Sequence, residues 1–236
     1  MPTKEKSYRN RLSGKGFRVK VEQTDLWISA PQELKPLATK AVVELRHQLE
    51  RYLTRHREFA KSLTPLEPLT GAPEIVRRMC KATQRAQVGP MAAVAGTIAQ
   101  LVGERLGKKV PEGAVENGGD LFLWGEGLRK VGIFSGDHPL HHLAIEVEVK
   151  SQLGICTSSG RIGHSLSLGK ANAVTVVSKD SSLADAWATA LANMVKGEES
   201  IPEVLKIVQN THEILAAVVI FEGKMGVWGD LRIINW

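Results

Sequence analysis

Residues 113–124 read Gly-Ala-Val-Glu-Asn-Gly-Gly-Asp-Leu-Phe-Leu-Trp, and the local pattern of this stretch indicates β-structure. Two short strand-like runs, at residues 114–116 and 121–124, flank a turn at residues 117–120. Adjacent glycines permit positive φ angles, and turns of this kind connect antiparallel strands. The stretch therefore predicts a β-hairpin, while its exposed backbone amides would equally suit an anion-binding nest.

Further strand-like runs surround this hairpin and are separated by glycine-containing turns. Residues 143–149 alternate apolar and polar side chains, which predicts a half-exposed strand of antiparallel type. The other predicted strands cover residues 17–21, 24–29, 128–134, 173–178, 215–221, 225–228 and 231–234.

Helical periodicity fills most of the intervening sequence. Predicted helices cover residues 31–62, 74–86, 89–107, 182–196 and 202–209. Pro90 suits the first turn of the third helix, and Gly107 suits its C-cap. Together these elements predict one α+β domain over residues 1–236, in which residues 1–16 form a basic and loosely ordered tail.

Composition narrows the class of protein. The chain has 236 residues, of which 43% are hydrophobic, so it can bury a substantial core. It has no run of about 18 apolar residues and no apolar segment of the signal-peptide type. Two cysteines are too few for a disulfide framework and suit a reducing compartment. We therefore predict a cytoplasmic protein that does not contact a membrane.

The formal net charge of +6 favours an anionic partner. Aromatic residues make up only 5% of the chain, and no zinc-finger or RNA-recognition motif is present, which disfavours nucleic acid. A small phosphate-bearing ligand is the better prediction. The arginine-rich face of the first helix, at residues 46–57, is interpreted as a solvated surface.

Asp185, Thr189 and Asn193 are spaced four apart and form one polar stripe on an otherwise apolar predicted helix. A carboxylate and a hydroxyl one turn apart can share a hard cation such as Mg²⁺. The alternative is helix capping, in which Ser182 and Asp185 form a capping-box-like pair at the start of the helix.

A second polar segment combines hydroxyls with glycine and is predicted to be a phosphate-wrapping loop or an ordinary polar turn. Cys156 abuts this segment and is either a small buried hydrophobe or a reactive thiol assisted by nearby positive charge. The segment contains Thr157, Ser158, Ser159 and Gly160, with His164 and Ser165 just beyond.

Four motifs in this order resemble the ApbE superfamily, whose best-known members are FAD:protein FMN transferases. They are Gly118-Gly-Asp120, Thr157 to Gly160, Thr175-Val-Val177 and Ala184 to Leu191. The resemblance implies an α+β fold related to the T-fold, with mixed sheets and flanking helices. It also implies that Asp185 and Thr189 hold Mg²⁺ against the diphosphate of FAD or a related nucleotide.

The same resemblance implies a set of ligand-contacting residues, with backbone donors from the start of the third helix. This set is Gly89, Met91, Asn117, Gly118, Gly119, Asp120, Thr157, Ser158, Ser159, Gly160 and Ser165. His164 and Cys156 are the candidate catalytic residues.

The chain departs from the transferases in two places. It lacks their His-Ile-Ile-Asp-Pro segment, and residues 89–97 contain no counterpart of their helix-start lysine. It resembles instead a shorter branch of the superfamily, which has been linked in archaea to sulfide assimilation into homocysteine. Three functions stay open: an FMN transferase that modifies a Thr or Ser of a partner protein, a sulfur-metabolism protein, and a non-catalytic binding protein. A homodimer formed through the C-terminal strands is a further expectation.

Overall fold

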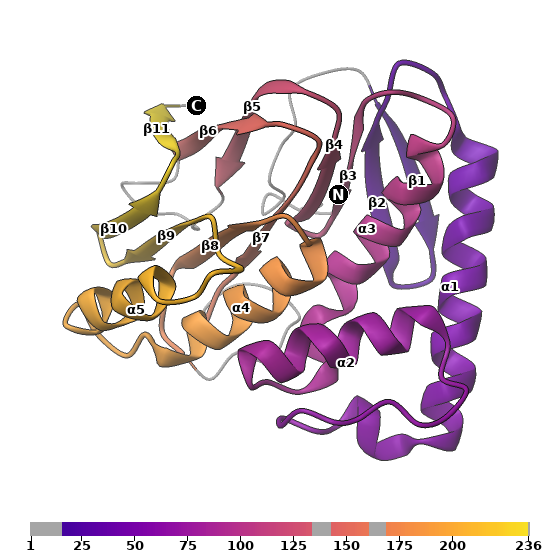
Figure 1. The fold of residues 1–236 in the computed structure, drawn as a ribbon, viewed down its shortest axis with the longest axis horizontal. Helices are drawn as coiled ribbons and strands as arrows, with labels where there is room; N and C mark the ends of the chain where they lie inside the picture. Colours follow the sequence, from indigo (N-terminus) through magenta and orange to yellow (C-terminus); the bar gives the residue numbers. More distant parts are fainter. Residues whose placement is uncertain (1–15, 134–142, 161–168, 236) are drawn as a thin grey trace, which may run out of the picture.

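An eight-stranded antiparallel sheet forms the centre of the molecule (Figure 1). The structure is a computed structural model that describes residues 16–133, 143–160 and 169–235. Strands follow the order β1-β2-β3-β4-β7-β8-β9-β10 in this sheet, and a smaller sheet has the order β11-β6-β5. The predicted tail lies outside the described residues, apart from Gly16.

The bounds of the elements are as follows. The strands are β1 (Phe17–Val21), β2 (Thr24–Ser29), β3 (Gly113–Asn117), β4 (Asp120–Trp124), β5 (Gly127–Ile133), β6 (Leu143–Val149), β7 (Gln152–Ser158), β8 (Ala173–Ser178), β9 (Ala216–Phe221), β10 (Lys224–Gly229) and β11 (Arg232–Asn235). The helices are α1 (Lys35–Arg55), η1 (Arg57–Ala60), α2 (Glu74–Ala86), η2 (Pro90–Ala93), α3 (Val94–Gly107), α4 (Ser181–Met194) and α5 (Ser200–Gln209).

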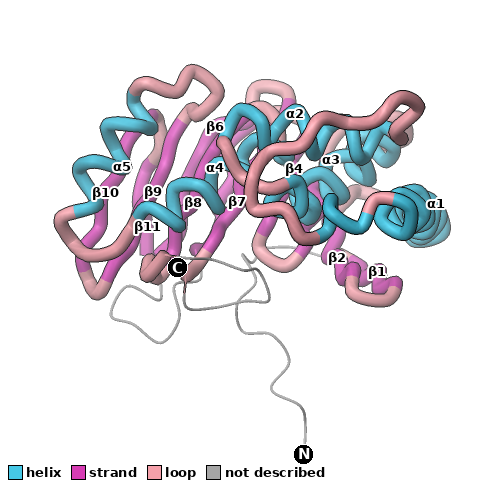
Figure 2. Tube along the Cα trace, turned by 90° about the horizontal axis from the view of Figure 1, so that it is seen from below, coloured by secondary structure: helices cyan, strands magenta, loops and turns pink. Residues whose placement is uncertain are grey.

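The two faces of the large sheet are buried against different partners. Successive strand residues point to opposite faces, so Leu153 and Ile155 of β7 pack toward the small sheet, whereas Cys156 packs against α4 and α5. Helices α1, α2 and α3 enclose another core over β1 to β4. Figure 2 shows the helices gathered along one side of the strands. None of the described helices is long and apolar enough to cross a bilayer.

Most predicted elements are present, and the predicted α+β architecture with flanking helices is confirmed. Strand β6 is antiparallel to both β5 and β11, as its alternating pattern predicts. The prediction of one continuous helix over residues 89–107 is wrong, because this segment forms two helical elements. Ala93 has φ −118° and ψ 9°, outside the helical region, and therefore separates the short η2 turn from α3. Gly107 is the last residue of α3, and Lys108 is the C-cap.

Strand β7 was not predicted, because its hydroxyl-rich end resembles a loop. Thr157 and Ser158 belong to this strand, which pairs with β4 on one side and β8 on the other. Only Ser159 and Gly160 follow it among the described residues of that segment. Thr157 and Ser158 consequently point to opposite faces of the sheet and do not form one phosphate-wrapping loop.

Candidate ligand and metal site

Asp185 of α4 binds the first turn of a neighbouring helix. Its Oδ2 accepts a hydrogen bond from the Gly96 amide of α3 at 2.8 Å. The first amides of a helix lack partners within the helix and carry partial positive charge, so a carboxylate suits this position. The capping interpretation for α4 itself is wrong. Asp180 is the N-cap, and its Oδ1 accepts from the Leu183 amide at 2.9 Å.

Gly96 allows α3 and α4 to approach closely enough for this contact. A Cβ atom at Gly96 would lie 2.3 Å from the Ser181 carbonyl oxygen and 2.8 Å from Cβ of Asp185. Gln100, one turn further along α3, accepts a hydrogen bond from the Ser181 amide at 2.7 Å. Thr189 follows Asp185 by one turn and is equally buried, with 8% of its surface exposed.

The glycine turn before β4 reaches the same helix start. Gly118 and Gly119 have φ angles of +68° and +117°, and the flanking residues pair in register, so the predicted hairpin is confirmed. Asn117 donates from Nδ2 to the Ala95 carbonyl oxygen at 3.1 Å. The Gly119 amide donates to Oε1 of Glu116 at 2.9 Å. This turn is thereby attached to the N-terminal end of α3.

Asp120 is the second buried carboxylate of the site. Burial raises its pKa from 3.8 to about 7, although hydrogen bonds from the Cys156 thiol and the Thr157 amide act in the opposite direction. Burial also raises the pKa of Asp185, and the charge of Asp120 raises it further. The two acids are therefore electrostatic neighbours contributed by different elements.

One oxygen of this pair has no partner. Oδ1 of Asp120 is buried and makes no hydrogen bond to the described residues. Leaving a buried acceptor unsatisfied is costly, so this atom is a candidate ligand-contacting group. A cation placed between the two carboxylates would satisfy it and favour the charged form of both acids.

This donor set fits Mg²⁺ better than a transition metal. Within the described residues, no group of three or more His, Cys, Asp or Glu side chains is arranged to hold a metal. Mg²⁺ commonly uses one or two carboxylates and completes its shell with waters and substrate phosphates. Asp120 and Asp185 are carboxylates of that kind, and Thr189 follows one turn beyond Asp185 on α4.

Cys156 belongs to the core. The side chain has no exposed surface, and its sulfur lies 3.4 Å from the Ser181 carbonyl oxygen. Burial raises the pKa of this thiol, and the charges of Asp120 and Asp185 raise it further. A reactive thiol would need nearby positive charge, but in the described structure Cys156 lies near two acids. Cys156 is therefore the small buried hydrophobe of the two alternatives.

We expect both thiols to be unreactive in the native protein. The two cysteines, Cys80 and Cys156, are both buried, and burial raises the pKa of Cys80 to about 11. A disulfide reagent such as Ellman's should titrate neither thiol under native conditions and both after denaturation. Cys80→Ser and Cys156→Ser variants would assign any reactive thiol, and rapid native labelling of Cys156 would contradict this burial.

Within the described part of the chain, the structure does not place the other predicted contact residues in direct contact with Asp120 or Asp185. Gly89 is buried, and a Cβ there would lie 1.8 Å from the Ser62 carbonyl oxygen, so its backbone packs tightly against the preceding connector. Met91 in η2 is half-buried. Ser159 Oγ donates to the Ala171 carbonyl oxygen at 3.4 Å. His164 and Ser165 lie outside the described residues.

Sequence reasoning missed the contribution of α3. The amides of Ala95 and Gly96 bind Asp185, whereas the prediction placed helix-start donors at Gly89. A glycine inside an apolar helix was the available signal, because glycine in such a position marks close approach of another element. The sequence does not show which element approaches.

The fold is of the ApbE type. The described structure superimposes on the flavinyl transferase ApbE of Pseudomonas stutzeri with a TM-score of 0.59, at 16% identity, covering 94% of this chain and 96% of that one. The flavin transferase ApbE of Vibrio cholerae gives a TM-score of 0.53 at 14% identity, covering 91% and 96%.

The family follows from sequence. The chain matches the family model described as "AbpE bacteria" over residues 9–222 and belongs to that family. It is 39% identical over 207 residues to a UPF0280 protein of Methanothrix thermoacetophila, covering 86% of this chain and 87% of the relative. A UPF0280 protein of Methanopyrus kandleri is 40% identical over 220 residues, covering 90% of each chain.

Proposed function

We propose that this protein binds FAD or a related flavin nucleotide together with Mg²⁺ at the Asp120–Asp185 site. The buried carboxylate pair, with Oδ1 of Asp120 unsatisfied, is the observation that carries this proposal. Two acids with raised pKa values in one buried place favour a cation, and a cation in turn favours a phosphate-bearing ligand. The similarity in fold to flavin transferases supports a flavin as that ligand.

In this proposal each part of the site has a separate role. Asp120, Asp185 and Thr189 hold the metal, which neutralises phosphate charge when bound. The turn at residues 117–119 contacts the nucleotide, together with Ser158, which points to the same face of β7 as Cys156, and with Ser159 and Gly160 just beyond the strand. Residues 89–91 contribute from the neighbouring turn. The described elements that frame the site, β4, β7, α3 and α4, keep these groups in fixed positions.

Flavin transfer to a partner protein is the second candidate function. The fold supports it, since the similar structures from Pseudomonas stutzeri and Vibrio cholerae are flavin transferases. His164 stays the candidate catalytic residue, and the hydroxyl acceptor would be a Thr or Ser of the partner. Release of AMP from FAD in the presence of Mg²⁺ and a cell extract depleted of small molecules tests this function. A sulfur-handling role gains no support from Cys156, which is buried beside two acids.

Calorimetric titration of metal-stripped protein with FAD tests the proposed function. We expect binding with Mg²⁺ and at least about tenfold weaker binding without it, because no metal then neutralises the charge of the diphosphate. Asp185→Asn should reduce the magnesium-dependent part by a similar factor.

Asp180→Asn is the matched control for this titration. Asparagine keeps an oxygen that can accept from the Leu183 amide, so the start of α4 is preserved. This variant should bind FAD and Mg²⁺ as the wild type does. Absence of FAD binding at about millimolar concentration, with or without Mg²⁺, would contradict the proposal. A cytoplasmic location and a homodimer stay predictions.

A further inference from the structure

A cavity of about 450 Å³ lies between α1 and the connector that leads to α2, which spans residues 61–73. Its walls include His47, Arg51, Arg55 and His56 on one side, and Thr70 and Gly71 on the other. His47, Arg51 and Arg55 are spaced four apart and therefore line one stripe of α1. Arg51 and Arg55 are exposed, as the solvated-face interpretation predicts, and the same stripe borders this pocket.

The arginines of this wall have no acidic partner. Arg51 and Arg55 form no ion pair or side-chain hydrogen bond within the part of the chain that the structure describes. Glu44 also lines the cavity, but its carboxylate pairs with Arg105 at 2.6 Å and with Lys40 at 4.0 Å. The cavity therefore carries an uncompensated positive charge.

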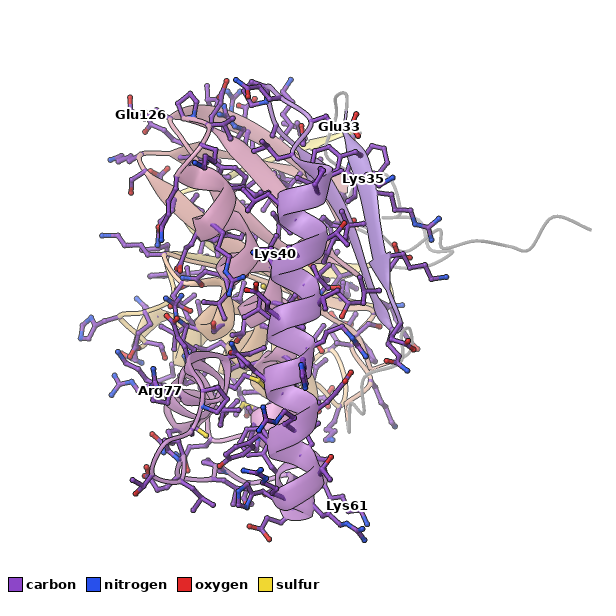
Figure 3. All side chains as sticks on the ribbon, turned by 90° about the vertical axis from the view of Figure 1, so that its right-hand side faces the viewer. Glu33, Lys35, Lys40, Lys61, Arg77 and Glu126 are labelled. Carbon is purple, nitrogen blue, oxygen red and sulfur yellow. The ribbon has the colours of Figure 1, made fainter. Side chains whose placement is uncertain are left out.

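The opposite wall is held in place by hydrogen bonds. The Leu69 amide donates to the Tyr52 hydroxyl at 3.3 Å, and the Ala72 amide donates to the Leu69 carbonyl oxygen at 3.0 Å. Arg77 of α2 donates to the Ala72 carbonyl oxygen. Figure 3 faces α1 directly, and Arg77 lies beside its lower half. The connector is thereby fixed at a set distance from α1, which leaves a preformed cavity.

Gly71 completes this wall. It has a φ angle of +78°, and no atom lies within 4 Å of the position that its Cβ would occupy. The turn therefore leaves its backbone accessible, and the neighbouring Thr70 is also exposed and lines the cavity. Fixed donors of this kind next to unpaired guanidinium groups suit an oxyanion with several acceptor oxygens.

We propose that this cavity binds the phosphate group of a small phosphorylated molecule. Two guanidinium groups can each donate in bidentate fashion to phosphate oxygens, and the imidazoles of His47 and His56 supply further donors. The volume suits a small metabolite. The cavity shares no lining residue with the Asp120–Asp185 site, so this second site is independent of the proposed flavin function.

Calorimetric titration with inorganic phosphate and with pyrophosphate, at low ionic strength, tests this second site. The Arg51→Gln/Arg55→Gln variant is expected to bind pyrophosphate at least about tenfold more weakly than the wild type. Arg51→Lys keeps the charge but loses the planar fork, and we expect a smaller loss of affinity from it.

Lys108→Gln/Lys109→Gln is the control with the same change in net charge. Both lysines are exposed at the end of α3 and do not line the cavity. This variant should keep pyrophosphate affinity within about twofold of the wild type. An equal loss in both double variants would overturn the proposal, because binding would then follow overall charge. Wild-type binding of a short single-stranded RNA in the absence of pyrophosphate binding would also overturn it.

Discussion

In the absence of metal, Asp120→Asn is expected to be more stable than the wild-type protein at about pH 8. Burial raises the pKa of Asp120 from 3.8 to about 7, so between these values the native state holds a proton that the unfolded state releases. The stabilising contribution of this proton is complete below the unfolded pKa of 3.8 and is lost as the pH rises toward 7.

The expected size of this effect follows from the pKa. The change from 3.8 to about 7 corresponds to about 4 kcal/mol as an upper limit. Asparagine is neutral at every pH used, and its oxygen can still accept a hydrogen bond from the Thr157 amide. Its buried NH₂ group needs partners of its own, so we expect a net gain of about 1–3 kcal/mol.

Urea unfolding of both proteins at about pH 4 and about pH 8 measures this difference. The two curves should be similar at the lower pH and separate at the higher one. Mg²⁺ should stabilise the wild type at the higher pH and leave Asp120→Asn unchanged, because ligands stabilise only the state that binds them. Parallel pH dependence in the two proteins would show that Asp120 is not the titrating group. A substitution that raises stability and abolishes binding is characteristic of a functional site.

Gly96→Ala is expected to destabilise the protein strongly. The added Cβ would lie 2.3 Å from the Ser181 carbonyl oxygen, so α3 and α4 must separate. Overpacking in a core costs about 1–3 kcal/mol and more when backbone has to move. Separation of the two helices also withdraws the Gly96 amide from Asp185, so magnesium-dependent FAD binding should weaken together with stability.

Gly107→Ala is the matched control, since it makes the same substitution on the same helix. Its Cβ would lie 3.5 Å from the Trp124 ring, which is an ordinary contact. Alanine is the better helix former, so this variant should be as stable as the wild type or more so. Chemical unfolding of the two variants tests the comparison. Equal stability of Gly96→Ala and Gly107→Ala would refute close packing at the α3–α4 crossing.

Much of the fold could be predicted from local pattern. Helix α2 begins and ends where its periodicity predicts, and the glycine pair at 118–119 forms the expected hairpin. Strand β7 was missed because its hydroxyl-rich end resembles a loop, and because burial on both faces of a central strand removes the alternation that identifies an exposed one. Its Thr157 hydroxyl lies 2.9 Å from that of Thr175 on β8, a partner that the local sequence does not reveal.

The same reasoning predicted only part of the site. Motif order pointed to Asp120 and Asp185, but their neighbours come from segments far apart in the chain. Gly96 contacts Asp185, and Asn117 contacts Ala95, although neither pair is close in sequence. Whether a carboxylate caps its own helix or a neighbouring one depends on helix packing, which residue spacing does not determine.

Strand β4 holds one side of the site rigidly in place. Leu121 and Leu123 are buried in the core shared with the small sheet, while Phe122 and Trp124 are buried under the helices. Asp120, the first residue of this strand, therefore cannot shift without disturbing two cores. We expect the carboxylate to act as a fixed receptor, with little ordering entropy lost when a ligand arrives. Adjustment to different ligands would then come from the glycine turn that precedes the strand, where side chains impose the least restraint.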